Sequence, residues 1–468
     1  MPQYKFIEAE TQSGKLSKPT SSIRSHAIRA GLRKSVNPPK AKGSLLSRGA
    51  GGDLVSLPIK GVNYRDSDSV LNISVQSVPI LSGRVDPFNC FPIPTNLATD
   101  HLVRYLITKF DFNSATADHR KSWFPYALQN APMMHSTLAM TAALWRAEYP
   151  ALEHSIRIEG IRQKGEAMRL TRAYLDLVDS AADGDEFTFI MSTISTLVII
   201  EVLDGDFEAA EMHLRGVHHL FSMRGGRDSF RDAWVFCKST NLADIQVAVA
   251  LGRQVIFPGL HQDQTRLPAS IISDAQHPPL NHSITDGGTY ECAAIFTQLR
   301  QLSLARQSSM VSFETQRTLL NVTDEIILQY LYQDRPDNAS DPGSSHALVL
   351  AAHIFMYVTL RQVPPRSPQI RRICVRLLGM VGIGPPAERT WVKNKAALLW
   401  IAFVGLLGTG ERVETCPLGQ SFVHIFRSAI REYPRDFLHG TSNLYKMLST
   451  FLWDESYCQP LLAWLGDR

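Results

Sequence analysis

Apolar residues recur at every third or fourth position through most of the chain after residue 95, which is the period of a helix with one buried face. The clearest case is residues 187–226. Its first half carries one apolar stripe, formed by Phe187, Ile190, Ile194 and Leu197. Its second half carries another, formed by Phe207, Ala210, Leu214, Val217 and Phe221. The pattern predicts two antiparallel helices that bury both stripes against further helices.

Residues that favour helix ends stand at both limits of the second helix. Asp206 follows Gly205 and is a good N-cap, because its carboxylate can accept hydrogen bonds from the free amides of the first turn. Gly225 and Gly226 supply the left-handed backbone that commonly ends a helix. We therefore expect a tight turn at 204–206 and a helix stop at 225–226.

Two kinds of residue in this pair break the pattern of their helices. Glu201 continues the apolar stripe of the first helix, and a buried carboxylate needs a partner. Arg215 or His213 on the second helix could provide it, and we expect a Glu201–Arg215 contact. Gly216 lies in mid-helix, where it costs about 1 kcal/mol relative to Ala, and we expect it to admit a closely packed neighbouring helix.

The helical period continues along the rest of the chain, and no run of alternating apolar and polar residues predicts a strand. A loop containing Pro and His is predicted at about 257–288. Further helices are predicted near 96–110, 122–130, 132–148, 151–178, 229–236, 240–255, 289–306, 312–333, 344–361, 368–380, 391–408, 418–432 and 456–465. The expected fold class is all-α, a large helical array of antiparallel helix pairs that occupies residues 86–468.

Residues 1–85 are predicted to form a disordered basic tail, because Ser, Gly, Pro and Lys dominate and few large apolar residues recur with a period. The first 50 residues hold ten Lys or Arg against Glu8 and Glu10, a balance of +8. Since the whole chain carries +4, the other 418 residues carry −4. The basic character of the protein is therefore a property of this tail.

One segment of the tail, Ile23–Lys34, has the sequence IRSHAIRAGLRK. Its basic residues are candidates for a nuclear import signal or for non-specific contacts with nucleic acid phosphates. The candidate residues are Arg24, Arg29, Arg33 and Lys34. The alternative interpretation is a solvated basic tail with no specific contact.

Six cysteines are present, which is the number that a binuclear zinc cluster uses, but their spacing does not fit one. They are Cys90, Cys237, Cys292, Cys374, Cys416 and Cys458, each at least 42 residues from the next. A zinc cluster needs paired Cys-x2-Cys spacings, so that thiolates converge on the metal. Most of the six lie in apolar helical patterns, and we expect them to be small buried hydrophobic side chains.

The sequence also gives little indication of a metal site, a phosphate-binding loop or a catalytic nucleophile. His213 and His218 are five residues apart rather than the four that place two ligands on one helix face, so no metal site is expected. The stretch 405–410 lacks the Gly-Lys-Ser/Thr of a phosphate-binding loop, and no G-x-S-x-G nucleophile motif occurs. We therefore predict that the protein is not an enzyme and has no catalytic residue, no cofactor and no metal.

No membrane association is expected. The opening residues lack the apolar core of a secretory signal. The longest apolar runs, 187–200, 347–360 and 396–408, are 13 or 14 residues long. A membrane-spanning helix needs roughly 20, so these runs are better explained as core helices.

The helix pair also carries a family resemblance. It resembles the fungal-specific transcription factor domain, which is the helical regulatory region downstream of the zinc-cluster DNA-binding domain in fungal regulators. The matching residues are Glu201, Gly205, Asp206, His213, Leu214, Arg215, Gly216, Arg224, Gly225 and Gly226. Trp123–Leu177 is also similar, and the resemblance covers about residues 95–260. We call 187–226 the signature hairpin.

The tail is similar to those that precede this helical domain in fungal regulators without a zinc cluster. The matching positions are Phe6, Ile7, Arg24, Ser25, His26, Arg29, Arg33 and Lys34. The resemblance implies a nuclear regulator of transcription whose partners are other regulatory proteins or a second copy of itself. Without zinc ligands it would reach DNA through a partner or through weak tail contacts. The alternatives are a cytoplasmic helical scaffold and an enzyme with an unrecognised site.

Overall fold

The computed structural model describes residues 11–12, 15–16, 86, 90–109, 122–149, 153–177, 184–230, 232–257, 259–260, 266–277, 280–285, 289–333, 343–382, 394–410, 416–431, 433 and 441–466. The chain divides into two compact units, Met1–Pro79 and Ile80–Arg468. Each unit is described by itself.

The first unit contains one short antiparallel pairing. Strand β1 (Thr11–Gln12) pairs with β2 (Lys15–Leu16), so that Thr11 lies opposite Leu16. The hydrophobic pattern does not predict this pairing, because strands of two residues are too short to show a period. The rest of the expected tail, 1–85, lies outside the described residues. This includes the four basic candidates Arg24, Arg29, Arg33 and Lys34.

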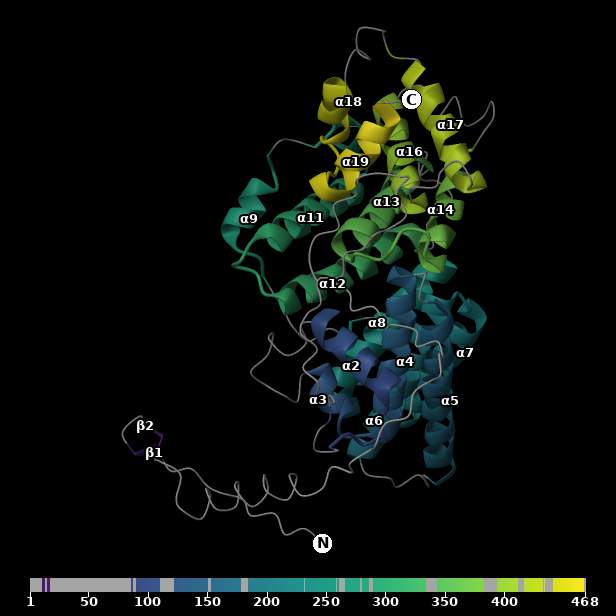
Figure 1. Ribbon diagram of the computed structural model, residues 1–468. Coiled ribbons are helices and arrows are strands. Elements are labelled where there is room, and N and C mark those ends of the chain that lie inside the picture. Colours follow the sequence, from purple (N-terminus) through teal and green to yellow (C-terminus); the bar gives the residue numbers. More distant parts are fainter. Residues whose placement is uncertain are drawn as a thin grey trace, which may run out of the picture. The chain divides into compact units, whose positions relative to one another are not determined.

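Helices build the described part of the second unit (Figure 1). Its first half contains α2 (Leu97–Lys109), α3 (Trp123–Ala127), α4 (Ala131–Glu148), α5 (Glu153–Leu177), α6 (Gly184–Asp204), α7 (Phe207–Met223), the 3-10 helix η3 (Gly226–Phe230) and α8 (Trp234–Leu251). Its second half contains α9 (Ala269–Asp274), α10 (His282–Thr285), α11 (Tyr290–Gln307), α12 (Phe313–Tyr332), α13 (Gly343–Phe355), the π-helix η4 (Met356–Leu360), α14 (Pro368–Val381), α16 (Lys395–Thr409), α17 (Pro417–Arg431), α18 (Thr441–Leu448) and α19 (Glu455–Gly466).

The structure confirms the all-α fold class, and two predicted details are wrong. The predicted break between 236 and 240 does not exist, because α8 continues through it. The polar residues there are satisfied within the fold: Ser239 Oγ donates to the carbonyl of Phe236 at 3.0 Å, and Thr240 shares a hydrogen bond of 2.8 Å with Ser195 of α6. The short helices α9, α10 and α18 are absent from the predictions, since four to eight residues give little periodic signal.

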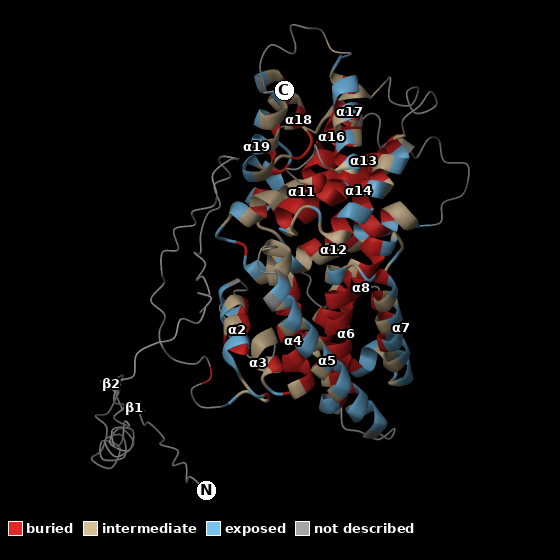
Figure 2. Cartoon of the chain, turned by 45° about the vertical axis from the view of Figure 1, so that its right-hand side comes forward, coloured by how far each residue is buried: buried red, intermediate tan, exposed pale blue. Residues whose placement is uncertain are grey.

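Helix α8 lies between the two largest hydrophobic cores. It gives Phe236 and Val247 to a core shared with α4–α7, and Ile245 and Val249 to a core shared with α11–α19. Because both sides of α8 are covered, the helix is buried on most of its faces rather than along one stripe, and its buried residues include Ser239, Thr240 and Asp244. Figure 2 shows the same distribution, with buried residues in α6, α8 and α13 and exposed residues along α5 and α7. A smaller core joins α2, α3 and α4.

One helix among the described residues, Glu186–Asp204, is long and apolar enough to cross a membrane by length and composition. Its most apolar window is 78% buried inside the protein. It packs against α4, α7 and α8, which is the environment of a core helix.

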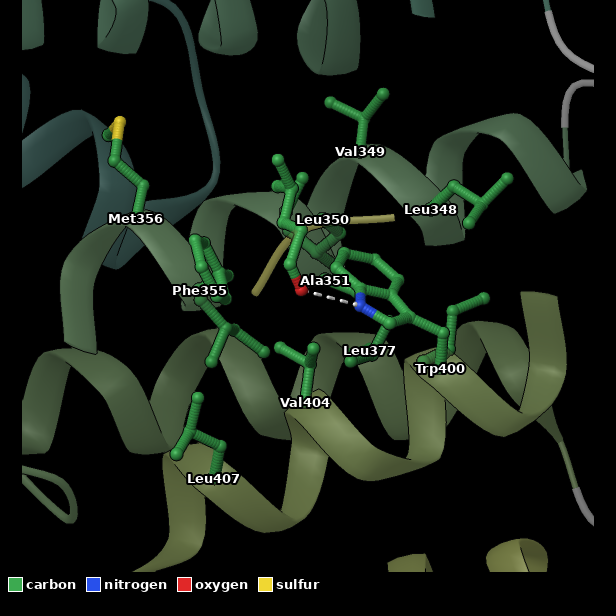
Figure 3. Packing of buried hydrophobic residues seen from close by; sticks show 14 of the residues in the cluster. Leu348, Val349, Leu350, Ala351, Phe355, Met356, Leu377, Trp400, Val404 and Leu407 are labelled. Carbon is green, nitrogen blue, oxygen red and sulfur yellow. Dashed lines mark hydrogen bonds between the residues drawn. The ribbon is translucent and has the colours of Figure 1, made fainter. Parts of the chain in front are cut away.

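The larger core is centred on α16 (Figure 3). Trp400, Val404 and Leu407 of α16 point toward α13. The indole nitrogen of Trp400 donates to the carbonyl of Leu452 at 3.3 Å, and its ring stacks on Phe451 with 5.2 Å between ring centroids. The segment after α18 is therefore anchored to the centre of the fold.

Candidate functional site

The turn of the signature hairpin is defined by its backbone. The amide of Asp206 donates to the carbonyl of Glu201 at 2.9 Å, and the amide of Gly205 donates to the carbonyl of Val202 at 3.1 Å. This is a Schellman ending, and Gly205 adopts the left-handed φ of +84° that it requires. A side chain at Gly205 would also lie 3.0 Å from Pro368 Cβ at the start of α14. The turn therefore needs glycine for both conformation and space.

The predicted helix ends of the hairpin are confirmed. The carboxylate of Asp206 accepts from the amide of Ala209 at 3.0 Å and caps α7. Gly225 and Gly226 follow α7 with φ of +86° and +67°. The two apolar stripes are buried as well, with Phe221 only partly covered.

Glu201 is buried, as predicted, with 7% of its side chain exposed. Lys164 of α5 places its Nζ 2.7 Å from the carboxylate, and Nε2 of His213 lies at 3.7 Å. Burial alone would raise the pKa of Glu201, but the interactions of its carboxylate with His213 and Lys164 outweigh burial and lower the pKa. Three helices therefore meet at one carboxylate.

The expected Glu201–Arg215 contact is wrong. Successive residues of a helix are rotated by about 100°, so His213 and Arg215 point in nearly opposite directions from α7. His213 faces α6, whereas the side chain of Arg215 is 76% exposed and pairs with Glu211 on its own helix at 3.0 Å. The partner that sequence reasoning missed is Lys164, which lies 37 positions before Glu201. No local periodicity could have placed it there.

Glu211 connects Arg215 of the hairpin to Arg253, which follows the end of α8. Its second oxygen accepts from Nη2 of Arg253 at 2.7 Å. Arg253 also approaches Asp244 of α8, with 3.5 Å between Nη1 and Oδ1. Burial alone would raise the pKa of Glu211. The hydrogen bonds and charges of Arg253 and Arg215 outweigh burial, and the pKa is lowered.

Asp244 holds the segment that follows α8. Its Oδ2 accepts from the amides of Ile256 and Phe257, each at 2.7 Å. Burial raises the pKa of Asp244 to about 6, although these amides and Arg253 favour its charged form. A chain of hydrogen bonds thus runs from Arg215 through Glu211, Arg253 and Asp244 to residues 256–257.

A surface hollow of about 470 Å³ lies at the glycine end of the hairpin. It is lined by His218, Phe221, Ser222, Gly225, Gly226, Arg227, Ile256, Phe257 and Leu260. The two glycines of the signature thus form part of its wall, and residues 256–257, fixed by Asp244, form another part. The candidate site therefore has two parts, the Glu201 centre and this hollow.

The fungal specific transcription factor domain model matches residues 100–405. The chain belongs to this family. The match extends the expected resemblance of about 95–260 through α14 and into α16, so it includes helices of both large cores. The family consists of fungal regulators of transcription, which act in the nucleus and are in general not enzymes. Searches of curated proteins and of solved structures each gave no match.

The structure corrects the role expected for one residue of the family signature. Gly216 is exposed, and a Cβ added there would have no atom within 4 Å except those of its own helix and chain neighbours. No helix of the described chain packs closely on it, so the expected close approach is wrong. His213 and Arg215 are accounted for by their ion pairs, whereas nothing in the structure explains a glycine at 216.

Two glycine substitutions are expected to have opposite effects. Gly216→Ala should raise the free energy of unfolding by about 0.5–1 kcal/mol, because Ala favours an exposed helix interior. Gly405→Ala should lower it by about 1–3 kcal/mol through overpacking, because the new Cβ would lie 2.7 Å from Cγ of the buried Phe422. Urea unfolding of both variants checks this. If Gly216→Ala lowered the free energy of unfolding instead, another group would have to pack closely against Gly216.

A second buried polar cluster within the matched region was not anticipated. Asp324 of α12 is fully buried, with His353 Nε2 at 2.6 Å and Arg361 Nε at 2.9 Å. Although burial alone would lower the pKa of the Arg361 guanidinium, the Asp324 carboxylate raises it. Arg361 ends the π-helix η4, and Gln362 after it adopts a left-handed φ of 54°. Asp and His within apolar runs were the only sequence signal for this cluster.

The cysteines are free, and most behave as small buried hydrophobic residues, as expected. Cys237, Cys292, Cys374 and Cys458 are buried, whereas Cys416 is half-buried and Cys90 is exposed. Burial raises the pKa of the Cys237 thiol to about 11 and that of Cys292 to about 12, which disfavours the thiolate that binds metal. Among the described residues, no three His, Cys, Asp or Glu side chains converge as metal ligands.

Proposed function

We propose that this chain regulates transcription in the nucleus through contacts of its helical domain with other regulatory proteins or with a second copy of itself. In this proposal it has no zinc cluster of its own and does not act as an enzyme. The observation that supports it is the family match over residues 100–405, which spans helices of both cores.

The charge distribution supports protein contacts rather than direct reading of DNA by the helices. The 418 residues after residue 50 carry −4, whereas duplex DNA is bound mainly by concentrated positive charge. The basic residues of the tail offer weak, salt-sensitive and sequence-independent contacts. Sequence-specific binding to DNA would then come from a partner. Specific binding by the purified chain alone would contradict this part of the proposal.

The alternative is a cytoplasmic scaffold, and localisation separates it from a nuclear regulator. We expect a fluorescent full chain to accumulate in the nucleus, and replacement of Arg24, Arg29, Arg33 and Lys34 by Ala to reduce that accumulation several-fold. The reason is that an import signal depends on a local cluster of basic residues. Microscopy of living cells measures the ratio of nuclear to cytoplasmic signal.

A matched control removes the same charge elsewhere in the tail, by replacing Lys5, Lys15, Lys18 and Lys40 with Ala. This variant should remain nuclear. The loss of nuclear accumulation would then depend on the position of the basic residues and not on the total charge of the tail. An even cytosolic signal from the unaltered chain and from both variants would favour the scaffold.

Chromatin occupancy tests the regulatory function itself. A tagged full chain at its natural level should be enriched at a limited set of promoters, and removal of the gene should change transcription from those promoters. Evenly distributed chromatin signal, with unchanged transcripts after removal, would contradict a regulator of transcription.

A further inference from the structure

The hollow at the glycine end of the signature hairpin has a distinct chemical character. Two phenylalanine rings, Phe221 and Phe257, meet nearly at right angles in its wall, with 5.3 Å between centroids and 81° between planes. His218 stands edge-to-face to Phe257 at 5.2 Å. Together these rings form an aromatic corner, which suits the face and edge of a further planar ring.

The walls of this corner are fixed before any ligand arrives. Phe257 is 3% exposed, and its amide is tied to the fully buried Asp244. Phe221 also stacks on Phe230, with centroids 5.3 Å apart. When the walls of a site are already ordered, ligand binding loses little conformational entropy, so the affinity is reduced little by ordering.

The described lining of the hollow carries positive but no negative side chains. It contains Arg227, His218 and Ser222, and none of its described residues is Asp or Glu. Arg227 is exposed at the rim, and its Nη1 would lie 3.7 Å from a Cβ added at Gly259. Among the described residues, no carboxylate forms an ion pair with it. A guanidinium in this position favours a planar carboxylate, which it can bind through two parallel hydrogen bonds.

We propose that the hollow binds a small aromatic carboxylic acid. Its ring packs against His218 and Phe221, which both contact the buried Phe257, and its carboxylate accepts hydrogen bonds from Arg227. The volume of about 470 Å³ lies within the range of small-molecule sites. The binding site is independent of the proposed role in transcription, and nothing in the family assignment specifies it.

Such a ligand would contact a segment that is already coupled to the hairpin. Residues 256–257 are tied through Asp244, Arg253 and Glu211 to Arg215 of the signature. Occupation of the hollow should therefore protect the segment after α8, as well as the end of α7, from local opening. Amide hydrogen exchange of 252–257 reports this protection directly.

The test is direct binding by the purified full chain. Benzoate and indole-3-acetate serve as probes, benzamide supplies a ring without the charge, and acetate supplies the charge without a ring. Calorimetry should give saturable binding of at least one aromatic acid at about millimolar concentration or below, and at least tenfold weaker binding of benzamide and acetate. Hydrogen exchange at 252–257 should slow in the presence of the acid that binds.

Three variants assign this binding to the hollow. Arg227→Ala should weaken it about tenfold or more, because a hydrogen bond to a charged group is lost. Ser222→Phe, at an exposed position of the wall, should abolish it by filling the space. Arg172→Ala removes an exposed arginine of α5 outside the hollow and should leave it unchanged. Absence of saturable binding by both acids, equal binding of benzamide, or full binding by Arg227→Ala and Ser222→Phe would each overturn the proposal.

Discussion

Replacement of Asp324 by Asn is expected to lower the free energy of unfolding by about 3–5 kcal/mol, the largest effect of any substitution considered. Asp324 is fully buried, and Arg361, with 12% of its side chain exposed, donates to it. Removal of the carboxylate charge leaves the guanidinium uncompensated where water cannot solvate it. Arg361 also donates to Asn321 at 2.8 Å, but that neutral oxygen cannot replace an ion pair. Urea unfolding of the full chain measures the loss.

A carboxylate on the same helix provides the control. Glu314 pairs with Lys238, but its side chain is 26% exposed, so Glu314→Gln should cost at most about 1 kcal/mol. Adding Arg361→Met to Asp324→Asn should restore part of the stability, because the unpaired cation is then gone. If Asp324→Asn costs no more than Glu314→Gln, the buried ion pair does not hold α12 to the end of η4.

Replacement of Glu201 by Ala should cost about 2–3 kcal/mol, because charge-assisted hydrogen bonds are lost and Lys164 is left partly buried without its partner. The side chains of Lys164 and His213 are each 22% exposed, so solvent screens this centre more than it screens Asp324. The pKa of Glu201 is lowered in the fold, so its contribution is full above the ordinary pKa of 4.5 and falls as pH drops below it. The difference in free energy of unfolding between the unaltered protein and Glu201→Ala should therefore become smaller as the pH falls below 4.5.

Arg215→Ala distinguishes the observed Glu201–Lys164 contact from the Glu201–Arg215 contact that the sequence suggested. Arg215 is 76% exposed and pairs only at the surface, so its loss should cost about 0.5 kcal/mol or less. Lys164→Ala should behave like Glu201→Ala, and the double variant should cost less than the sum of the two. Equal costs for Glu201→Ala and Arg215→Ala would instead indicate that these two residues interact.

The sequence predicted those features of the fold that depend on neighbouring residues. The stripe of Phe187, Ile190, Ile194 and Leu197 is buried because three- and four-residue spacing places these side chains on one helix face. The cap by Asp206 and the stops at Gly225 and Gly226 follow from local backbone chemistry in the same way.

Features that depend on contacts distant in sequence were missed or misassigned. Lys164 reaches Glu201 from another helix, and Asp324, His353 and Arg361 meet from three elements. The break predicted between 236 and 240 was wrong, and the polar residues there make contacts distant in sequence: Lys238 pairs with Glu314 of α12, and Thr240 shares a hydrogen bond with Ser195 of α6. The hollow was not predicted either, because Phe257 and Leu260 of its lining lie in the predicted loop of about 257–288, and the amide of Phe257 is held by Asp244 of α8.

The most direct test of the central claim is transcription from a reporter to which the chain is tethered. The full chain is fused to an unrelated DNA-binding domain whose sites lie upstream of the reporter gene. If the chain regulates transcription, the fusion should change reporter transcript levels several-fold relative to the DNA-binding domain alone, and Glu201→Ala should weaken the change. Unaltered transcript levels with a folded, promoter-bound fusion would contradict the claim.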